Sequence, residues 1–327
     1  MRLSVGEFAA QGGLKPILPS DPDDLLFVAC SFEPRASTVV SQLTDAYAAR
    51  VGVLYYNEEI LTAKLQLSAR DALHKMRRTV TDHVEALVEI KGNLRNPSAQ
   101  LNSFRELFGG KRIDPDSVKN ITVDSTAFNR ESLLILFGLL DSYFPSAKKR
   151  VLYVSPEGYG DWLSTGFQQV RNVIGLGGLQ NPAKRTLLAV LYGFEHHRAI
   201  KTIEEHEPSK VLLGFGGSPT EVEFLKRNLE ELDKVRKLAL SQQEVQEFEF
   251  PADGIATCAA RLEEVLALHL ESYNLVIAPM STKLSTLSAY LFARKHPQVQ
   301  ISYCVPAEYN IESYSQGAKT VFAEDLT

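Results

Sequence analysis

Two short stretches of this sequence repeat each other: VACSFEPR at 28–35 and VLYGFEHHR at 190–198. Each is an apolar run followed by Phe-Glu and then by an arginine two or three residues later. A second pair follows in the same order, VLYVSPEGYG at 151–160 and ISYCVPAEYN at 301–310. The pairs are offset by 162 and 150 residues, which indicates one unit present twice with loops of unequal length. Duplicated units tend to pack about a pseudo-twofold axis, so we expect their equivalent loops to surround one shared cleft.

Length and composition fit two ordinary globular domains. The chain has 327 residues, enough for about two domains of roughly 100–200 residues each. Hydrophobic residues make up 44% and charged residues 23%, which is typical of folded proteins. We predict a first domain at 1–160, a connector at 161–184 and a second domain at 185–327. The net charge of −5 argues against direct nucleic-acid binding, because domains that bind by charge usually carry a basic face.

The sequence carries no sign of export or of a membrane anchor. The first residues, MRLSVGEFAAQGG, lack the apolar core of a signal peptide, and no run approaches the roughly 18 apolar residues of a membrane span. Three cysteines are too few and too scattered for a disulfide framework, so we expect a cytoplasmic protein in which Cys30 and Cys304 are core residues. Two basic clusters, at 75–78 and 148–150, are expected to be solvated surface.

Short apolar runs alternate with longer amphipathic ones, which is typical of a mainly parallel sheet covered by helices. The fold class is therefore α/β, with two tandem, internally duplicated Rossmann-like domains. Strands are predicted at 25–30, 51–56, 84–90, 121–124, 151–154, 187–192, 211–215, 245–250, 275–278 and 300–305, with an edge strand near 320–323. Helices are predicted at 36–49, 58–78, 98–108, 130–143, 197–205, 220–239, 254–272 and 284–296.

Polar residues follow the first strand of each half, where open α/β sheets bind their ligands. They are Ser31, Glu33 and Arg35 in the first half and Glu195 and Arg198 in the second. A glutamate beside an arginine can fix the guanidinium as a planar fork that grips phosphate. Alternatively, the Glu and Arg residues pair across the domain interface and hold the two halves together. The sequence leaves both interpretations open.

Hydroxyls and one cation open a helix after the penultimate strand of each half. Ser125, Asn129 and Arg130 lie in DSTAFNR at 124–130, and the second half has PMSTK at 279–283. Backbone N–H groups at a helix N-terminus favour anions, so each turn is a candidate phosphate site. Plain helix capping explains the hydroxyls equally, but a cation in the first turn opposes the helix dipole and favours anion binding.

Glycines and tyrosines complete the candidate ligand site. Gly216, Gly217 and Ser218 lie in a strand-to-helix turn that has neither the GxGxxG nor the GxxxxGK[ST] spacing, so dinucleotide and P-loop chemistry are not indicated. A tight turn explains these glycines almost as well. Tyr159 and Tyr309 end the two Pro-x-x-Tyr repeats and could stack on a base or cover the sheet edge.

Enzymatic signals are weak in this sequence. His196 and His197 are adjacent, but no further His, Cys or carboxylate cluster around them has a metal-binding spacing, so no metal or other cofactor is expected. There is no GxSxG motif and no cysteine with an evident catalytic partner. Glu33 and Glu195 remain as candidates for a pair of hydrolytic carboxylates.

The run NLVIAPMSTKLSTLSAYLFARKHPQVQISY at 274–303 resembles the C-terminal strand, Thr-Lys turn and helix of CARF-type domains, the Rossmann-like sensors of CRISPR-associated cyclic oligoadenylates. In that family the turn contacts ligand phosphate, and Ser281, Thr282 and Lys283 match the pattern residue by residue. Met280 and Ser281 stand where the family commonly has two glycines. The first half departs further, with Asn129 and Arg130 in place of Thr-Lys.

Two CARF-like units in one chain also resemble SAVED domains, which sense cyclic nucleotides in anti-phage signalling and are normally tethered to an effector. Two full units leave no residues for an effector here, so the resemblance implies a separate effector protein as partner. The leading hypothesis is a non-enzymatic sensor or adaptor that binds a nucleotide-type anion, a cyclic oligonucleotide, in the cleft between the halves. The alternatives are a ring-nuclease-like or other hydrolase acting in the same cleft, and a structural scaffold subunit of a defence complex.

Overall fold

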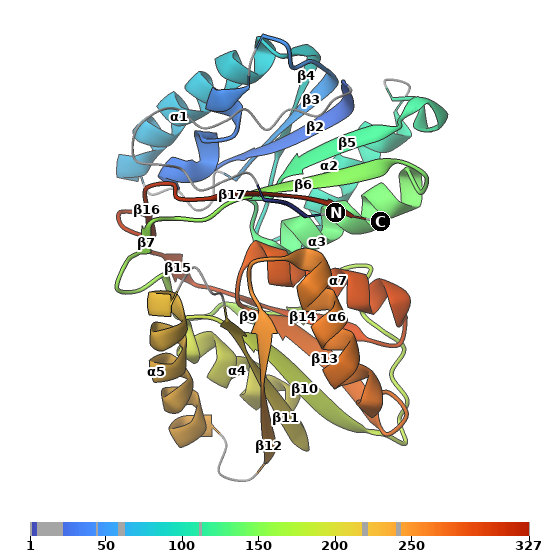
Figure 1. Ribbon diagram of the computed structural model, residues 1–327, viewed down its shortest axis with the longest axis vertical. Helices are drawn as coiled ribbons and strands as arrows, with labels where there is room; N and C mark the ends of the chain where they lie inside the picture. Colours follow the sequence, from blue (N-terminus) through green and yellow to red (C-terminus); the bar gives the residue numbers. More distant parts are fainter. Residues whose placement is uncertain are drawn as a thin grey trace. The chain divides into compact units, whose positions relative to one another are not determined.

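The computed structural model describes residues 2–4, 22–43, 45–57, 63–110, 113–217, 222–239 and 243–326. It divides the chain into two compact units. The first unit is Met1–Gly160 together with Ile311–Thr327, and the second unit is Asp161–Asn310. Each unit combines one large sheet with helices that lie against it (Figure 1).

The sheet of the first unit has the strand order β1-β17-β6-β5-β2-β3-β4. Strands β2 to β6 are parallel, whereas β17 runs antiparallel to β6 and β1. The strands are β1 (Arg2–Ser4), β2 (Asp23–Cys30), β3 (Ala49–Tyr56), β4 (Val84–Lys91), β5 (Asn120–Asp124), β6 (Lys148–Val154) and β17 (Val321–Leu326). The helices and 3-10 turns are η1 (Pro34–Ser37), η2 (Val40–Gln42), α1 (Ala63–Thr81), α2 (Pro97–Gly109), η4 (Pro115–Ser117) and α3 (Arg130–Tyr143).

The second unit repeats this arrangement with the strand order β12-β11-β10-β13-β14-β9. Strands β10 to β14 are parallel, and β9 runs antiparallel to β14. The strands are β9 (Gln169–Asn172), β10 (Arg185–Tyr192), β11 (Lys210–Gly217), β12 (Glu244–Pro251), β13 (Tyr273–Pro279) and β14 (Gln300–Val305). The helices are α4 (His196–His206), α5 (Val222–Ala239), α6 (Ile255–Leu266), the 3-10 turn η5 (Ala267–His269) and α7 (Lys283–Lys295).

The two units are copies of one topology, so the predicted α/β fold with two Rossmann-like units and mainly parallel sheets is confirmed. The fold could be predicted from the sequence because its central strands are continuously buried, β2 from Leu25 to Cys30 and β10 from Leu187 to Tyr192. Strands covered on both faces must be apolar throughout, which gives continuous hydrophobic runs. The three cysteines are free thiols buried in these cores, as predicted for Cys30 and Cys304.

One predicted helix is wrong. The segment 36–49 was expected to be helical, but it forms only the 3-10 turns η1 and η2 before the chain enters β3. Its sequence has the β-branched run Thr38-Val39-Val40 between two serines. β-branched residues lose side-chain freedom in a helix, and serine hydroxyls compete for backbone groups, so this segment does not hold a helix. The other predicted helices form, although 58–62 of the second and 220–221 of the sixth lie outside the described residues. The helix predicted at 254–272 ends at Leu266 and continues only as the 3-10 turn η5.

The antiparallel strands β9 and β17 pair with strands that are distant in sequence. The predicted connector 161–184 lies in the second unit, where β9 pairs with β14, and 311–327 lies in the first unit, where β17 pairs with β6. The strand predicted near 320–323 forms as β17, but it does not close an edge of the sheet, because β1 pairs with its other side. Short ladders precede β9 and β17 in the chain: β7 (Gly158–Tyr159) pairs with β16 (Ser315–Gln316), and β8 (Ser164–Thr165) pairs with β15 (Glu308–Tyr309).

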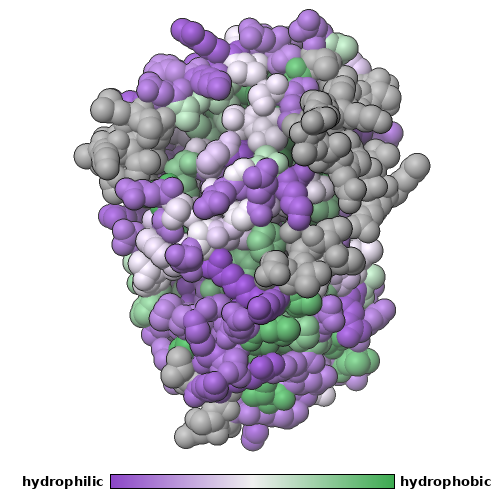
Figure 2. All heavy atoms as spheres, turned by 60° about the vertical axis from the view of Figure 1, so that its left-hand side comes forward, coloured by the Kyte–Doolittle hydropathy of each residue, from purple (hydrophilic) through white to green (hydrophobic). Residues whose placement is uncertain are grey.

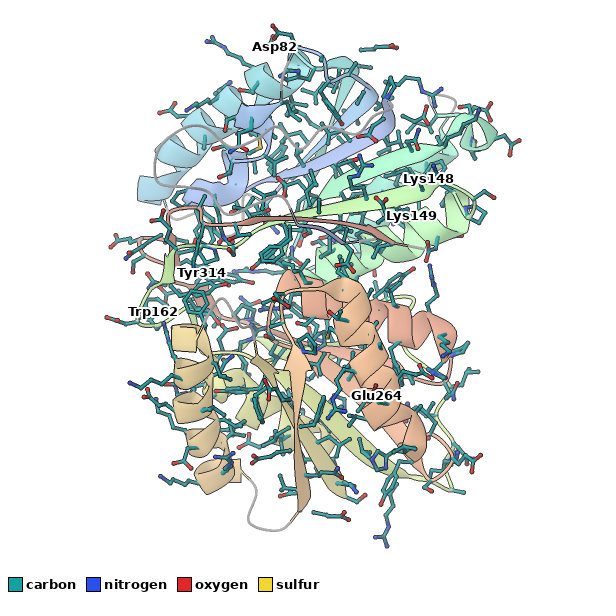
Figure 3. All side chains as sticks on the ribbon, in the orientation of Figure 1. Asp82, Lys148, Lys149, Trp162, Glu264 and Tyr314 are labelled. Carbon is teal, nitrogen blue, oxygen red and sulfur yellow. The ribbon has the colours of Figure 1, made fainter. Side chains whose placement is uncertain are left out.

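The basic cluster at 148–150 is not entirely solvated surface. Lys148 and Lys149 are neighbours on β6 (Figure 3), but Lys149 is only 5% exposed. Its Nζ donates to the carbonyls of Phe144 and Ala147 and lies 3.0 Å from Asp141 Oδ1. Because successive side chains of a strand point to opposite faces, adjacent lysines cannot both remain in solvent on a covered sheet.

Hydrophilic side chains predominate on the molecular face drawn in Figure 2, and hydrophobic residues form small patches between them. Within the described residues, no helix is long and apolar enough to cross a membrane.

Candidate functional site

Arg35, the arginine of the first repeat, lies inside the first unit with 2% of its surface exposed. Its Nε donates to Glu33 Oε2 at 2.8 Å, and its Nη1 donates to the carbonyl of Val154 at 2.5 Å. Ser315 Oγ donates to the same Glu33 oxygen at 3.0 Å, and the guanidinium lies 5.5 Å from the ring centre of Tyr153. These residues form the first clasp, which ties the loop after β2 to the end of β6 and to β16.

Arg198 forms an equivalent cluster, the second clasp, inside the second unit. It is also 2% exposed, and its Nη1 donates to Glu195 Oε2 at 2.6 Å. Its Nε donates to the carbonyl of Cys304 at 3.0 Å, and Ser164 Oγ from β8 donates to Glu195. The guanidinium again lies 5.5 Å from a tyrosine ring centre, that of Tyr303. The loop after β10, the end of β14 and β8 are thereby joined.

Both clasps hold a charged pair. Burial alone would lower the pKa of Arg35 and Arg198, but Glu33 and Glu195 raise the pKa of both guanidinium groups above the ordinary value. Each arginine therefore stays charged, with its compensating carboxylate inside the same unit. The guanidinium N–H groups donate to carboxylates and carbonyls inside their own unit, which favours a structural role for the Glu and Arg residues that were predicted to bind a ligand.

The two predicted tyrosines extend the clasps. Tyr309 Oη lies 3.4 Å from Tyr303 Oη. Burial raises the pKa of Tyr159 well above its ordinary value, and the neighbouring Tyr153 raises it further. Tyr159 and Tyr309 therefore pack beside the clasp tyrosines, half-buried, at the ends of the short ladders.

The turn before α3 in the first unit uses its hydroxyls internally. Ser125 is fully buried, and its Oγ donates to the carbonyl of Leu152 at 2.8 Å. Asn129 is the N-cap of α3 and accepts from the Ser132 N–H at 2.8 Å, while Arg130, the first residue of the helix, is half-buried. Asp124, at the end of β5, is 1% exposed, and burial raises its pKa to about 6.

The equivalent turn in the second unit lies where the loops of four strands converge. Thr282 caps α7 by accepting from the Ser285 N–H at 3.1 Å and donates to the carbonyl of Ala252, just after β12, at 2.9 Å. The Met280 N–H donates to the Leu191 carbonyl of β10 at 2.8 Å. Ser281 is half-buried, and Lys283 is the first residue of α7 with 8% exposed.

Glycines allow this convergence. A Cβ at Gly193 would lie 2.4 Å from the Met280 carbonyl oxygen, and one at Gly216 would lie 2.9 Å from Ala252 Cβ and 3.2 Å from Ser281 Oγ. A Cβ at Gly217 would lie 2.1 Å from a carboxylate oxygen of Glu249. The loops after β10 and β13 therefore meet at the point where the strand order reverses, which is where open α/β sheets bind ligands. Ser218 lies outside the described residues.

The adjacent histidines begin α4. His196 Nδ1 lies 2.6 Å from Glu231 Oε2 on α5, and the ring centres of His196 and His197 are 3.8 Å apart. Burial lowers the pKa of His197, and so does His196. No group of three or more His, Cys, Asp or Glu side chains in the described part of the chain could hold a metal ion.

Sequence reasoning missed the serines and the strand tyrosines of the clasps. A signal was present, because Ser164-Thr165-Gly166 and Ser315-Gln316-Gly317 repeat a Ser-x-Gly pattern. Both glycines have a left-handed backbone, with φ of 61° at Gly166 and 59° at Gly317, which glycine adopts without strain. Tyr153 and Tyr303 also stand at the same place in the second repeated stretch.

The fold is similar to that of a solved structure described as "Structure of a Type III CRISPR defence DNA nuclease activated by cyclic oligoadenylate". The TM-score is 0.50 at 8% identity, and the match covers 91% of this chain and 68% of the other. A second match is to a structure described as "Adenylation, ketoreductase, and pseudo Asub multidomain structure of a keto acid-selecting NRPS module", at 12% identity over 90% of this chain and 33% of that one. Its TM-score of 0.22 does not indicate a shared fold. No family model matches the sequence, and no curated protein does.

Proposed function

We propose that this protein is a non-enzymatic sensor or adaptor that binds a nucleotide-type anion, a cyclic oligonucleotide, in prokaryotic antiviral defence. The observation that carries the proposal is the convergence of strand-end loops on the turn Met280–Lys283, at the N-terminus of α7. Backbone N–H groups and the positive end of the helix dipole favour an anion there. The similarity of fold to a nuclease activated by cyclic oligoadenylate supports the same ligand class.

Ser281 and Lys283 are the side chains that we assign to ligand phosphate. Thr282 is the cap that positions them, because its hydroxyl is engaged by Ser285 and Ala252. Lys283 is a cation in the first turn of a helix, a place that the dipole disfavours, so an anionic ligand would offset the cost. Arg130 stands at the equivalent first position of α3 in the first unit.

The clasp residues are left out of the proposed ligand site. Arg35 and Arg198 donate to strand carbonyls and to their glutamates, and those glutamates also accept from Ser315 and Ser164. A carboxylate held by an arginine and a serine is a poor general base, which supports a non-enzymatic sensor over a hydrolase using Glu33 or Glu195. A separate effector protein would then receive the signal.

The binding test is calorimetric titration of the full chain with cyclic oligoadenylates of several ring sizes. We expect one member to bind, and Lys283→Ala to weaken it about ten- to a hundredfold, the range for a charge-assisted hydrogen bond of about 1.5–3 kcal/mol. Ser281→Asp should abolish binding by repulsion while the helix N-terminus tolerates the new carboxylate. Lys237→Ala, whose side chain is 72% exposed on α5, is the control for loss of one positive charge.

Absence of heat with every member of the panel would refute the proposed ligand class. Chromatography of the ligand after incubation separates the sensor from the hydrolase, because a sensor returns the ligand intact. If the ligand is cleaved and Glu33→Gln or Glu195→Gln stops the cleavage, the hydrolase alternative is correct.

A further inference from the structure

The first unit contains a cavity of about 290 Å³ beside the end of its central strand. It lies between the end of β2, the turns η1 and η2, and helix α1, and we call it the β2–α1 cavity. Seven of its lining residues are Cys, Phe, Pro, Ala, Val or Met, and four others carry hydroxyls. The lining residues that matter below are Cys30, Glu33, Ala72 and Lys75.

The corresponding place in the second unit is built from different residues. Tyr192 stands in the repeat where the first unit has Cys30, and its side chain is fully buried. Helix α4 replaces the short turns η1 and η2, and His196 at its start reaches Glu231 of α5. The two units therefore surround this place with different residues and elements, so the topology alone does not dictate what lines the cavity of the first unit. The atoms that line a cavity lose packing contacts, so a cavity costs stability. This cost makes the cavity a feature of the first unit that needs its own explanation.

The charges around the cavity favour an anion. Glu33 lies in the wall, but Arg35 compensates its charge within the first clasp. Lys75 comes from an exposed position of α1, and its ammonium has no carboxylate partner among the described side chains. Burial raises the pKa of the Cys30 thiol to about 11, so that part of the wall is neutral. The cavity thus has mainly apolar walls and one available cation, the ammonium of Lys75.

We propose that the β2–α1 cavity is a second binding site, for a small amphipathic anion with a flat apolar or aromatic body and one acidic group. The apolar walls would cover the body, and Lys75 would pair with the acidic group. The cavity volume lies just below the range of roughly 300–1,000 Å³ for small-molecule pockets, which excludes a cyclic oligonucleotide as the ligand. This site is in the first unit and is independent of the turn Met280–Lys283.

The test uses two fluorescent probes on the full chain: 1-anilinonaphthalene-8-sulfonate, an aromatic anion, and N-phenyl-1-naphthylamine, its neutral analogue. We expect saturable one-to-one binding of both probes. Lys75→Ala should weaken binding of the anion about two- to fivefold and leave binding of the neutral probe unchanged, as expected for one partly exposed ion pair worth up to about 1 kcal/mol. Arg78→Ala removes an exposed positive charge from the same helix outside the cavity and should change neither probe.

Ala72→Phe provides an independent test. Ala72 is exposed on α1, so a phenyl ring there should block the cavity without disturbing the core, and it should abolish binding of both probes. Ser281→Asp should leave both probes unaffected, which separates this site from the proposed nucleotide site. Near-ultraviolet circular dichroism must be native, because anilinonaphthalene sulfonate also binds loosened proteins. Undiminished binding to Ala72→Phe, or equal effects of Lys75→Ala and Arg78→Ala, would overturn the proposal.

Discussion

The two units have the same topology, and each contains a buried clasp, but they differ at the segment that follows the central strand. In both, an arginine joins a glutamate, a serine and a strand carbonyl, with a tyrosine ring 5.5 Å away. After β2, however, the chain forms two 3-10 turns beside a cavity, whereas after β10 it forms α4 against α5. The clasp is present in both units, which supports a role in stabilising the fold, whereas the segment after the central strand differs and is where we propose a binding site in the first unit.

The largest expected effect comes from breaking the shared feature. Arg35→Ala and Arg198→Ala should each cost about 3–5 kcal/mol of stability, because each leaves a buried glutamate without its counter-charge. The measurement is urea unfolding, followed by circular dichroism and by the fluorescence of the single tryptophan, Trp162. Trp162 is in the second unit, two residues before the clasp serine Ser164, and is labelled in Figure 3.

Arg185→Ala is the control for the clasps, since Arg185 is exposed at the start of β10 and should cost less than about 0.5 kcal/mol. If the clasp variants behaved like this control while losing ligand affinity, Arg35 and Arg198 would belong to the ligand site after all.

A smaller effect is expected from exchanging the residue that distinguishes the units. Tyr192→Cys gives the second unit the residue of the first and leaves an unfilled space, at a cost of about 2–4 kcal/mol. Tyr192→Phe is the matched control, because the buried Tyr192 hydroxyl has no hydrogen-bond partner within the described residues and its removal should not destabilise. Urea unfolding followed by Trp162 fluorescence measures both, and equal stability of the two variants would show that ring packing there is unimportant.

The smallest effect is a pH dependence confined to the first unit. Burial raises the pKa of Asp124 to about 6 from 3.8, so the folded protein holds a proton that the unfolded chain releases. Protonated Asp124 contributes its full stabilisation below about pH 4, and this contribution is lost as the pH rises through about 6. The stability of Asp124→Asn relative to that of the wild type should therefore increase by about 1 kcal/mol as the pH rises from 5 to 7.5. Ala278 occupies the equivalent place in β13 and does not titrate.

Thermal or urea unfolding at the two pH values measures this difference. Asn can still accept the Thr126 N–H bond that Asp124 Oδ1 accepts, so the substitution isolates the charge. A difference between the variant and the wild type that does not change with pH would mean that Asp124 ionises at its ordinary value.

The fold was largely predictable because its signals are local. The buried strand β14 and the helix α3 were predicted with the bounds that the structure has, since a continuous apolar run and an amphipathic period each depend on neighbouring residues. The helix predicted at 36–49 does not form, because the β-branched run Thr38-Val39-Val40 disfavours a helix despite the apolar spacing of the segment. The pairing of the antiparallel strands β9 and β17 was not predictable in this way, since their partners β14 and β6 are distant in sequence.

The sequence by itself determined that this protein is a duplicated α/β chain whose Phe-Glu-Arg and Pro-x-x-Tyr stretches are equivalent, because repetition is visible in the order of residues alone. Only the tertiary structure decided what those stretches do. It turned the two arginines inward to strand carbonyls and brought Ser315 to Glu33 and Ser164 to Glu195. It also left a cavity beside Cys30, whereas Tyr192 is fully buried at the equivalent position of the other unit. A side chain becomes a clasp or a ligand contact through residues far along the chain, and no local pattern specifies them.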